Sequence, residues 1–171
     1  MTGVQTCALP IWGENYVSGA IQNLAVGNTQ AVAQRLAALT GAPLFQLEPC
    51  QPYSDRYDLC IQQAQDDQRR DARPALKRLP ESLDGYDTIY LGYPNYWGTM
   101  PMCVFTFLEA FDFTGKTICP FCTHEGSGLG RSEGDIRRLC PGAKVARGLA
   151  IHGSTVCREE RALEAWLKGG M

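Results

Sequence analysis

The stretch TIYLGYPNYWG (residues 88–98) is a short apolar run that stops abruptly in a loop rich in glycine and aromatic residues. A second stretch, TICPFCTHEGSG (residues 117–128), has the same form, and a helical pattern follows each of them. Short apolar runs that alternate with helices indicate buried parallel strands, and open parallel sheets bind ligands beyond the carboxyl ends of their strands. The first loop offers flat aromatic faces and the second a closely approaching backbone. Together they would suit a planar heterocycle with polar edges.

The composition is that of an ordinary globular domain. The chain has 171 residues, of which 44% are hydrophobic and 20% charged, so one domain with a sizeable core is expected. A net charge of −2 disfavours a nucleic-acid surface, because phosphate binding needs clustered Lys and Arg. No apolar stretch approaches the roughly 20 residues that span a bilayer, and no secretory pattern is visible. We expect a soluble, cytoplasmic protein without a membrane or nucleic-acid partner.

Eight cysteines are scattered along the chain, and a chain of this size needs no disulfide to stabilise its core. We therefore expect most of them to be reduced and to act as small apolar residues.

The first eleven residues do not resemble the opening of a doubly wound domain, which usually begins with a continuous apolar strand. Residues 2–6 are largely polar, and Pro10 would remove a hydrogen-bond donor from a central strand. The string also resembles translated sequencing-adapter read-through at the start of metagenome-derived reading frames. We interpret residues 1–11 as a non-native segment that replaces the true first strand, and residues 12–171 as the domain. A natural disordered terminus is the alternative.

The rest of the chain alternates between strand and helix patterns. A loop rich in Gly, Asn and Ser is expected over residues 12–26. Strands are predicted at 43–48, from 88, from 117 and at 145–151, and helices from 27, from 54 or 55 to about 71, from 101, from 132 or 133, and at 159–168. Four strands that alternate with five helices predict an α/β sandwich whose missing strand should precede Gly27.

Three loops carry candidate binding residues. Gly27, Asn28 and Thr29 open a helix, where free N–H groups and the helix dipole favour a phosphate, although Asn and Thr are also ordinary helix caps. In residues 93–98 the proline fixes the turn and two aromatic side chains offer stacking faces, although such residues also fill cores or contact partners. Three glycines in residues 126–130 allow backbone N–H groups to face a ligand such as a flavin edge, although a flexible turn has the same composition.

The run from Leu91 to Ile151 resembles the short-chain flavodoxin-like family, and PFCTHEGSGLG (residues 120–130) is its most diagnostic string. The similarity extends over roughly residues 12–168. The resemblance implies a three-layer sandwich around a five-stranded parallel sheet in the order 2-1-3-4-5, with FMN bound noncovalently at the strand ends. The chain departs from the family pattern at two points, which are the long loop before Gly27 and the lack of a visible first strand with its terminal Ser or Thr.

The resemblance also implies the residues that would contact FMN. Two would hold the phosphate, four would flank the isoalloxazine ring, and five would line its polar edge: Asn28 and Thr29; Pro94, Asn95, Tyr96 and Trp97; Thr123, His124, Glu125, Gly126 and Ser127. The implied function is electron transfer, or FMN-dependent reduction of a small acceptor such as a quinone. The donor is open between NAD(P)H and a redox partner protein.

In this interpretation the flavin carries the chemistry, so neither a catalytic residue nor a metal is assigned. His124 is the one candidate proton donor, because a histidine titrates near neutral pH, although a loop histidine more often bonds the backbone.

Two other functions compete with this one. Cys119 and Cys122 form a CxxC motif that could make a thiol oxidoreductase, but within a strand residues three apart point to opposite faces. Zinc binding by these cysteines with Cys103, Cys140 or His152 lacks a second CxxC. The third possibility is a flavodoxin-shaped module that has lost its cofactor and acts as a binding surface.

Overall fold

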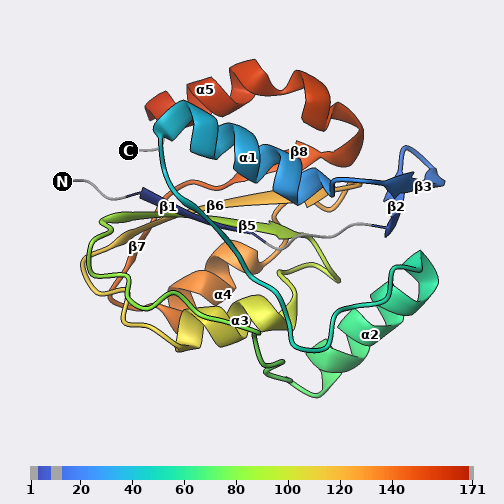
Figure 1. Ribbon diagram of the computed structural model, residues 1–171, viewed down its shortest axis with the longest axis horizontal. Helices are drawn as coiled ribbons and strands as arrows, with labels where there is room; N and C mark the ends of the chain where they lie inside the picture. Colours follow the sequence, from blue (N-terminus) through green and yellow to red (C-terminus); the bar gives the residue numbers. More distant parts are fainter. Residues whose placement is uncertain (1–3, 9–12, 170–171) are drawn as a thin grey trace.

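The computed structural model describes residues 4–8 and 13–169, which form a parallel sheet covered by helices on both faces (Figure 1). The main sheet has the order β4-β1-β5-β6-β7, and β8 also pairs with β6; every one of these pairings is parallel. The strands are β1 (Val4–Ala8), β4 (Leu44–Gln46), β5 (Thr88–Pro94), β6 (Thr117–His124), β7 (Lys144–Val145) and β8 (Leu149–His152). The predicted α/β sandwich with a parallel sheet is confirmed.

Helices cover the two faces of this sheet in pairs. The helices are α1 (Asn28–Thr40), α2 (Tyr57–Arg69), α3 (Met102–Glu109), α4 (Ser132–Leu139) and α5 (Glu160–Gly169), with a 3₁₀ helix, η1 (Gly153–Arg158), after β8. In Figure 1, α1 and α5 lie on one face of the sheet and α3 and α4 on the other. Helix α2 lies toward one end of the molecule, on the same side as the tips of β5 and β6.

Each face of the sheet carries its own apolar core. Tyr90 and Phe121 pack with α1 and α5, whereas Leu91 and Ile118 pack with α3 and α4. Successive residues of β5 thus enter opposite cores, which is why the central strands are continuous apolar runs rather than alternating ones.

The expectation that the chain lacks a first strand is wrong. Residues 4–8 form β1 in the middle of the sheet, where Thr6 pairs with Leu44 on one side and Tyr90 on the other. Val and Thr favour extended backbone, and a neighbour on each side can satisfy the backbone groups of even a polar strand. Pro10 lies outside the described residues, and the foreign origin of residues 1–11 stays a prediction.

The segment over residues 12–26 was expected to be a loop, and this expectation is wrong as well. Residues 13–24 form an antiparallel hairpin of β2 (Gly13–Val17) and β3 (Ala20–Leu24), separate from the main sheet. Ser18 and Gly19 join the strands with φ of 53° and 85°. Positive φ at both central residues matches the twist of a two-residue hairpin turn.

The last predicted strand, over residues 145–151, is divided into β7 and β8, so the sheet has six strands rather than five. Ile118 of β6 pairs with Val145 of β7, and Phe121 of β6 pairs with Leu149 of β8. The two residues are three positions apart on β6, but their partners are four positions apart in the chain. One extra residue interrupts the ladder as a bulge does. Gly148 N donates instead to Glu133 Oε1 (2.6 Å) on α4.

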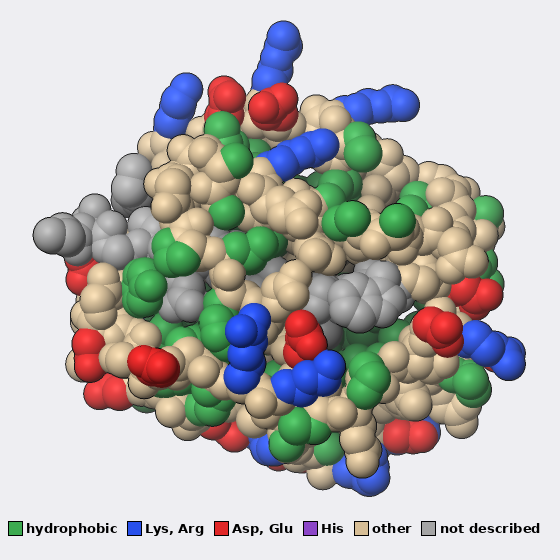
Figure 2. Space-filling model, viewed as in Figure 1, with side chains coloured by type: hydrophobic (Ala, Val, Ile, Leu, Met, Phe, Trp, Pro, Cys, Tyr) green, Lys and Arg blue, Asp and Glu red, His purple; other side chains and the backbone are tan. Residues whose placement is uncertain are grey.

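The surface carries charges of both signs. Acidic and basic side chains are interspersed over the face shown in Figure 2. No helix in the described ranges is both long enough and apolar enough to pass through a membrane. The seven cysteines among the described side chains are free, and five of them are buried.

Gly92 tests the packing of β5 against β6. A Cβ atom on residue 92 would lie 2.8 Å from Phe121 Cε1 and closer still to Cζ. We expect Gly92→Ala to lower the free energy of unfolding by about 1–3 kcal/mol or more, because an extra carbon in a packed core forces neighbours apart. Urea denaturation measures this change. The control is Gly134→Ala on the exposed side of α4, where nothing lies within 4 Å and alanine should be neutral or stabilising. Equal stability of Gly92→Ala and wild type would contradict this packing.

Candidate functional site: a pocket at the carboxyl ends of β5 and β6

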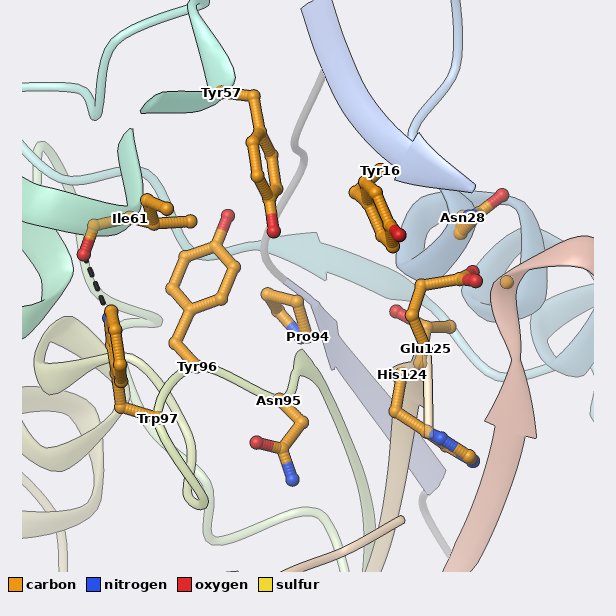
Figure 3. Close-up of a pocket in the computed structure, with 12 residues that line it drawn as sticks. Tyr16, Asn28, Tyr57, Ile61, Pro94, Asn95, Tyr96, Trp97, His124 and Glu125 are labelled. Atoms are coloured by element: carbon orange, nitrogen blue, oxygen red, sulfur yellow. Dashed lines mark hydrogen bonds between the residues drawn. The ribbon is translucent and has the colours of Figure 1, made fainter. Parts of the chain in front are cut away.

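A pocket of about 270 Å³ lies where β5 and β6 end, below α2 and the β2–β3 hairpin (Figure 3). Twelve residues from six parts of the chain line it: Tyr16, Asn28, Tyr57, Ile61, Pro94, Asn95, Tyr96, Trp97, Thr123, His124, Glu125 and Gly153. Its position is the one that open parallel sheets use for ligands.

Asn95 joins the aromatic loop to the glycine-rich loop. Its Nδ2 donates to Gly128 O (2.6 Å), its Oδ1 accepts from Gly98 N (3.0 Å), and its backbone N–H donates to Thr123 O (2.9 Å). The two loops therefore meet at one rim of the sheet, as the sequence predicts.

A second contact holds the same loops together further from the strands. Arg131 N donates to Gly98 O (2.8 Å). Gly130 has φ of +55°, and a Cβ atom there would overlap the backbone of Gly98. This close approach is available only to glycine.

The aromatic side chains of the first loop are fixed from α2. Trp97 has φ of 53°, and its indole Nε1 donates to Ile61 O (2.8 Å), while 47% of its surface stays exposed. The Tyr96 hydroxyl lies 3.3 Å from Cys60 Sγ, and the Tyr53 ring meets the Tyr96 ring edge-on at 6.1 Å. Burial raises the pKa of Tyr96 well above its usual value, so this ring stays a neutral phenol.

The far end of the pocket is polar. A Cβ atom on residue 153 would lie 2.7 Å from Asn28 Nδ2 and closer still to Glu125 Oε1, so both side chains occupy the space that Gly153 leaves. Glu125 Oε2 accepts from Ser18 N (3.0 Å) and lies 3.6 Å from His152 Nε2. Glu125 Oε1 is buried, and no described residue donates to it. This oxygen is an acceptor that a ligand can satisfy.

The surroundings of His124 favour its neutral form. Its Nδ1 accepts from Gly126 N (2.9 Å), and its ring lies edge-on to His152 at 5.6 Å. Burial lowers the pKa of His124 and the His152 ring lowers it further, while Glu125 acts in the opposite direction. The contact with Gly126 N is the backbone hydrogen bond expected of a loop histidine.

Of the eleven residues predicted to contact a ligand, eight line the pocket and three do not. Thr29 is buried, and its hydroxyl pairs with that of Thr123 (2.7 Å), so any contact it makes would use its backbone. Gly126 donates its N–H to His124, and both Gly126 and Ser127 are exposed outside the pocket wall. That any of the eleven binds a cofactor stays a prediction.

Four lining residues were missed from the sequence: Tyr16, Tyr57, Ile61 and Gly153. The Ser-Gly turn at residues 18–19 was the signal that could have revealed the hairpin and thereby Tyr16. Tyr57 and Ile61 belong to a helix that was predicted, but no local pattern shows that this helix lies above the pocket.

The thiol alternative does not fit the structure. Cys119 lies in the core under α1 and α5, and Cys122 in the core under α3 and α4, so the two thiols are on opposite faces of the sheet. Burial raises the pKa of Cys119 to about 11 and that of Cys122 to about 12, which removes the thiolate that exchange needs. Among the described side chains, which are those of residues 13–169, no group of three or more His, Cys, Asp or Glu could hold a metal ion.

The fold and the pocket together define a doubly wound α/β protein with a ligand site at the carboxyl ends of its strands. The flavodoxin family pattern (Flavodoxin_4) matches residues 19–169, which is most of the chain. This protein therefore belongs to the flavodoxin family, and the predicted resemblance is confirmed.

Solved structures show the same fold. A candidate flavoprotein from Bacteroides eggerthii DSM 20697 is 26% identical, with a TM-score of 0.75 over 99% of this chain and 98% of that one. Another from Bacteroides uniformis ATCC 8492 is 24% identical, with a TM-score of 0.77 over 98% of both chains. A Lactobacillus acidophilus NCFM flavoprotein, crystallised in complex with FMN, is 14% identical, with a TM-score of 0.65 over 94% of this chain and 99% of that one. No curated protein matches significantly.

The depressed pKa of His124 predicts a pH effect on stability. The folded protein binds fewer protons at this site than the unfolded chain does near pH 6.5, so the free energy of unfolding falls as the pH drops through that range. His124→Asn keeps an acceptor for Gly126 N without this titration. We expect the variant to lose less stability than wild type between about pH 7.5 and about pH 5.5, measured by urea denaturation. The other titrating groups are the same in both proteins. Parallel plots of the free energy of unfolding against pH for the variant and wild type would contradict the lowered pKa of His124.

Proposed function

We propose that this protein binds FMN in the pocket and uses it to transfer electrons, either to a redox partner protein or to a small acceptor such as a quinone. The observation that carries the proposal is the junction made by Asn95, which places an aromatic loop and a polar loop around one slot. Such a slot offers stacking faces along its sides and hydrogen-bonding groups at its end. The FMN complex of the Lactobacillus acidophilus protein of the same fold supports the choice of ligand.

The residues present fit the chemistry of FMN. Glu125 Oε1 is a buried acceptor without a described donor, and a ribityl hydroxyl or a ring N–H would satisfy it. Asn28 lines the pocket in the first turn of α1, where the backbone N–H groups of residues 28 and 29 have no acceptor within the helix. An N-terminal helix turn favours a phosphate.

Within this proposal each group of residues has a distinct task. Asn28 and the start of α1 hold the phosphate, the 94–97 segment flanks the ring, and Thr123, His124 and Glu125 line its polar edge. Gly126 and Ser127 remain predicted contacts outside the pocket wall. FMN, when bound, supplies one-electron or hydride transfer. The protein positions the ring and keeps water from its faces.

The partners and location follow as part of the same proposal. The electron donor is NAD(P)H or a redox protein, and the reaction takes place in the cytoplasm.

The direct test is a titration of ligand-free protein with FMN and with riboflavin, followed by flavin fluorescence. We expect one FMN per chain, and an FMN affinity about five- to tenfold higher than that for riboflavin, because only FMN brings a phosphate to the α1 N-terminus. Asn28→Ala should narrow this difference, while Leu39→Ala at the exposed far end of α1 should not. Absence of binding by either flavin would refute the proposal.

Trp97 tests the aromatic side of the slot. We expect Trp97→Ala to weaken FMN binding by about 1–3 kcal/mol, the scale of base stacking on aromatic side chains. Trp97→Phe keeps a flat face but loses the hydrogen bond to Ile61 O, so it should bind with intermediate affinity. Dissociation constants from the same titration provide the measurement. An unchanged constant for Trp97→Ala would remove this side chain from the site.

A further inference from the structure

The β2–β3 hairpin lies outside the main sheet (Figure 1), and its Tyr16 lines the pocket. Its Tyr16 ring stacks on the Tyr57 ring of α2, with centroids 5.8 Å apart and planes inclined by 28°. In Figure 3 both rings extend into the pocket from the side opposite Asn95. The pocket therefore has aromatic groups on two sides, of which only Tyr96 and Trp97 belong to the loop after β5.

The base of the hairpin is fixed to the start of α2. Glu14 Oε2 accepts from Tyr57 N (3.0 Å), and Glu14 N donates to Asp55 O (2.8 Å). Gly13 has φ of +101°, and a Cβ atom there would lie only 2.8 Å from Asp55 O. The chain can approach α2 this closely because residue 13 has no side chain.

The tip of the hairpin is fixed on the other side of the pocket. Ser18 N, in the turn, donates to Glu125 Oε2 (3.0 Å) on the loop after β6. The hairpin thus spans the pocket between two carboxylates, Glu14 near its base and Glu125 at its tip. Both contacts are charge-assisted hydrogen bonds from backbone N–H groups, which are stronger than neutral ones.

Tyr16 leaves 41% of its surface exposed in this arrangement. A planar ring in the slot would cover part of that surface and gain an aromatic contact. The volume of about 270 Å³ is close to the lower end of the range for small-molecule sites, roughly 300–1,000 Å³. It provides space for one ring system between the two aromatic sides.

We propose that Tyr16 and Tyr57 form a second stacking face for the FMN ring, and that Glu14 and Glu125 hold the hairpin over it. This inference rests on the proposed function and adds to it a cover that governs cofactor release. With the hairpin in place, both faces of the ring are enclosed. Release of FMN then requires the hairpin to separate from α2 or from Glu125.

The experiment measures FMN association and dissociation rates by stopped-flow fluorescence for wild type, Tyr16→Ala and Tyr16→Phe. We expect Tyr16→Ala to dissociate about tenfold faster or more, within the range of aromatic stacking energies. Its bound FMN should also fluoresce more strongly, because a stacked phenol quenches flavin emission. Tyr16→Phe keeps the ring and should match wild type in both measurements.

The carboxylate contact is tested by Glu14→Ala, which removes the acceptor of Tyr57 N but leaves both tyrosines in place. We expect FMN to associate and dissociate faster than in wild type, because the cover opens more readily. Loss of stacking alone, as in Tyr16→Ala, should change mainly the dissociation rate. The pair of variants therefore separates the stacking face from the attachment of the hairpin.

Failures of the two proposals are distinguishable. If wild type binds FMN while Tyr16→Ala keeps its dissociation rate and bound fluorescence, the hairpin is only structural and the inference is overturned. If wild type binds no FMN, the proposed function fails and this inference with it. Circular dichroism checks that each variant is folded. If Tyr16→Ala unfolds the protein, Tyr16→Leu replaces it, because leucine keeps apolar bulk without a flat ring. The FMN dissociation rate and bound fluorescence of that variant then decide between the outcomes.

Discussion

The site depends on the side-chain amide of Asn95. Parallel pairing brings the ends of β5 and β6 into register, but the ladder between these two strands ends where Pro94 lies opposite Thr123. Asn95 replaces the ladder, because it accepts from Gly98 and donates to Gly128 while its own backbone N–H bonds Thr123 O. A carboxylate in its place could not donate, and an apolar residue could do neither. Together with the bond from Arg131 N to Gly98 O, this residue sets the relative position of the aromatic and polar loops.

The electrostatic character of the pocket follows from which residues line it. Among the described lining residues none is Lys or Arg, and the one formal charge is the carboxylate of Glu125. A negatively charged ligand group therefore has only dipoles to stabilise it, from the start of α1 and from Asn28. The affinity of a flavin for such a site would come mainly from contacts with its ring. The aromatic residues would therefore contribute more to the affinity for a flavin than the phosphate motif does.

The parts of the fold predicted from sequence are those in which local pattern and tertiary environment agree. Strands β5 and β6 are continuous apolar runs because both faces are buried, and the loops after them carry Gly, Pro and aromatic residues. Strand β1 was not predicted because its neighbours, rather than its own apolar character, place it in the sheet. The wall formed by Tyr16 and Tyr57 was also missed, since it exists only once the hairpin packs against α2. Thr29 was predicted to hold the phosphate, but its hydroxyl is buried and bonds to the hydroxyl of Thr123 instead.

Glu125 links the two ends of the site. One of its carboxylate oxygens bonds the hairpin turn at Ser18, and the other is buried beside Asn28 and Gly153 without a described donor. A ligand that donates to the second oxygen would fix the carboxylate in the orientation that the hairpin contact requires. Occupation of the polar end and closure of the cover would then favour each other, because both use the same side chain. Such reciprocity requires no movement of the sheet, since β5, β6 and Asn95 already hold the rest of the pocket in place.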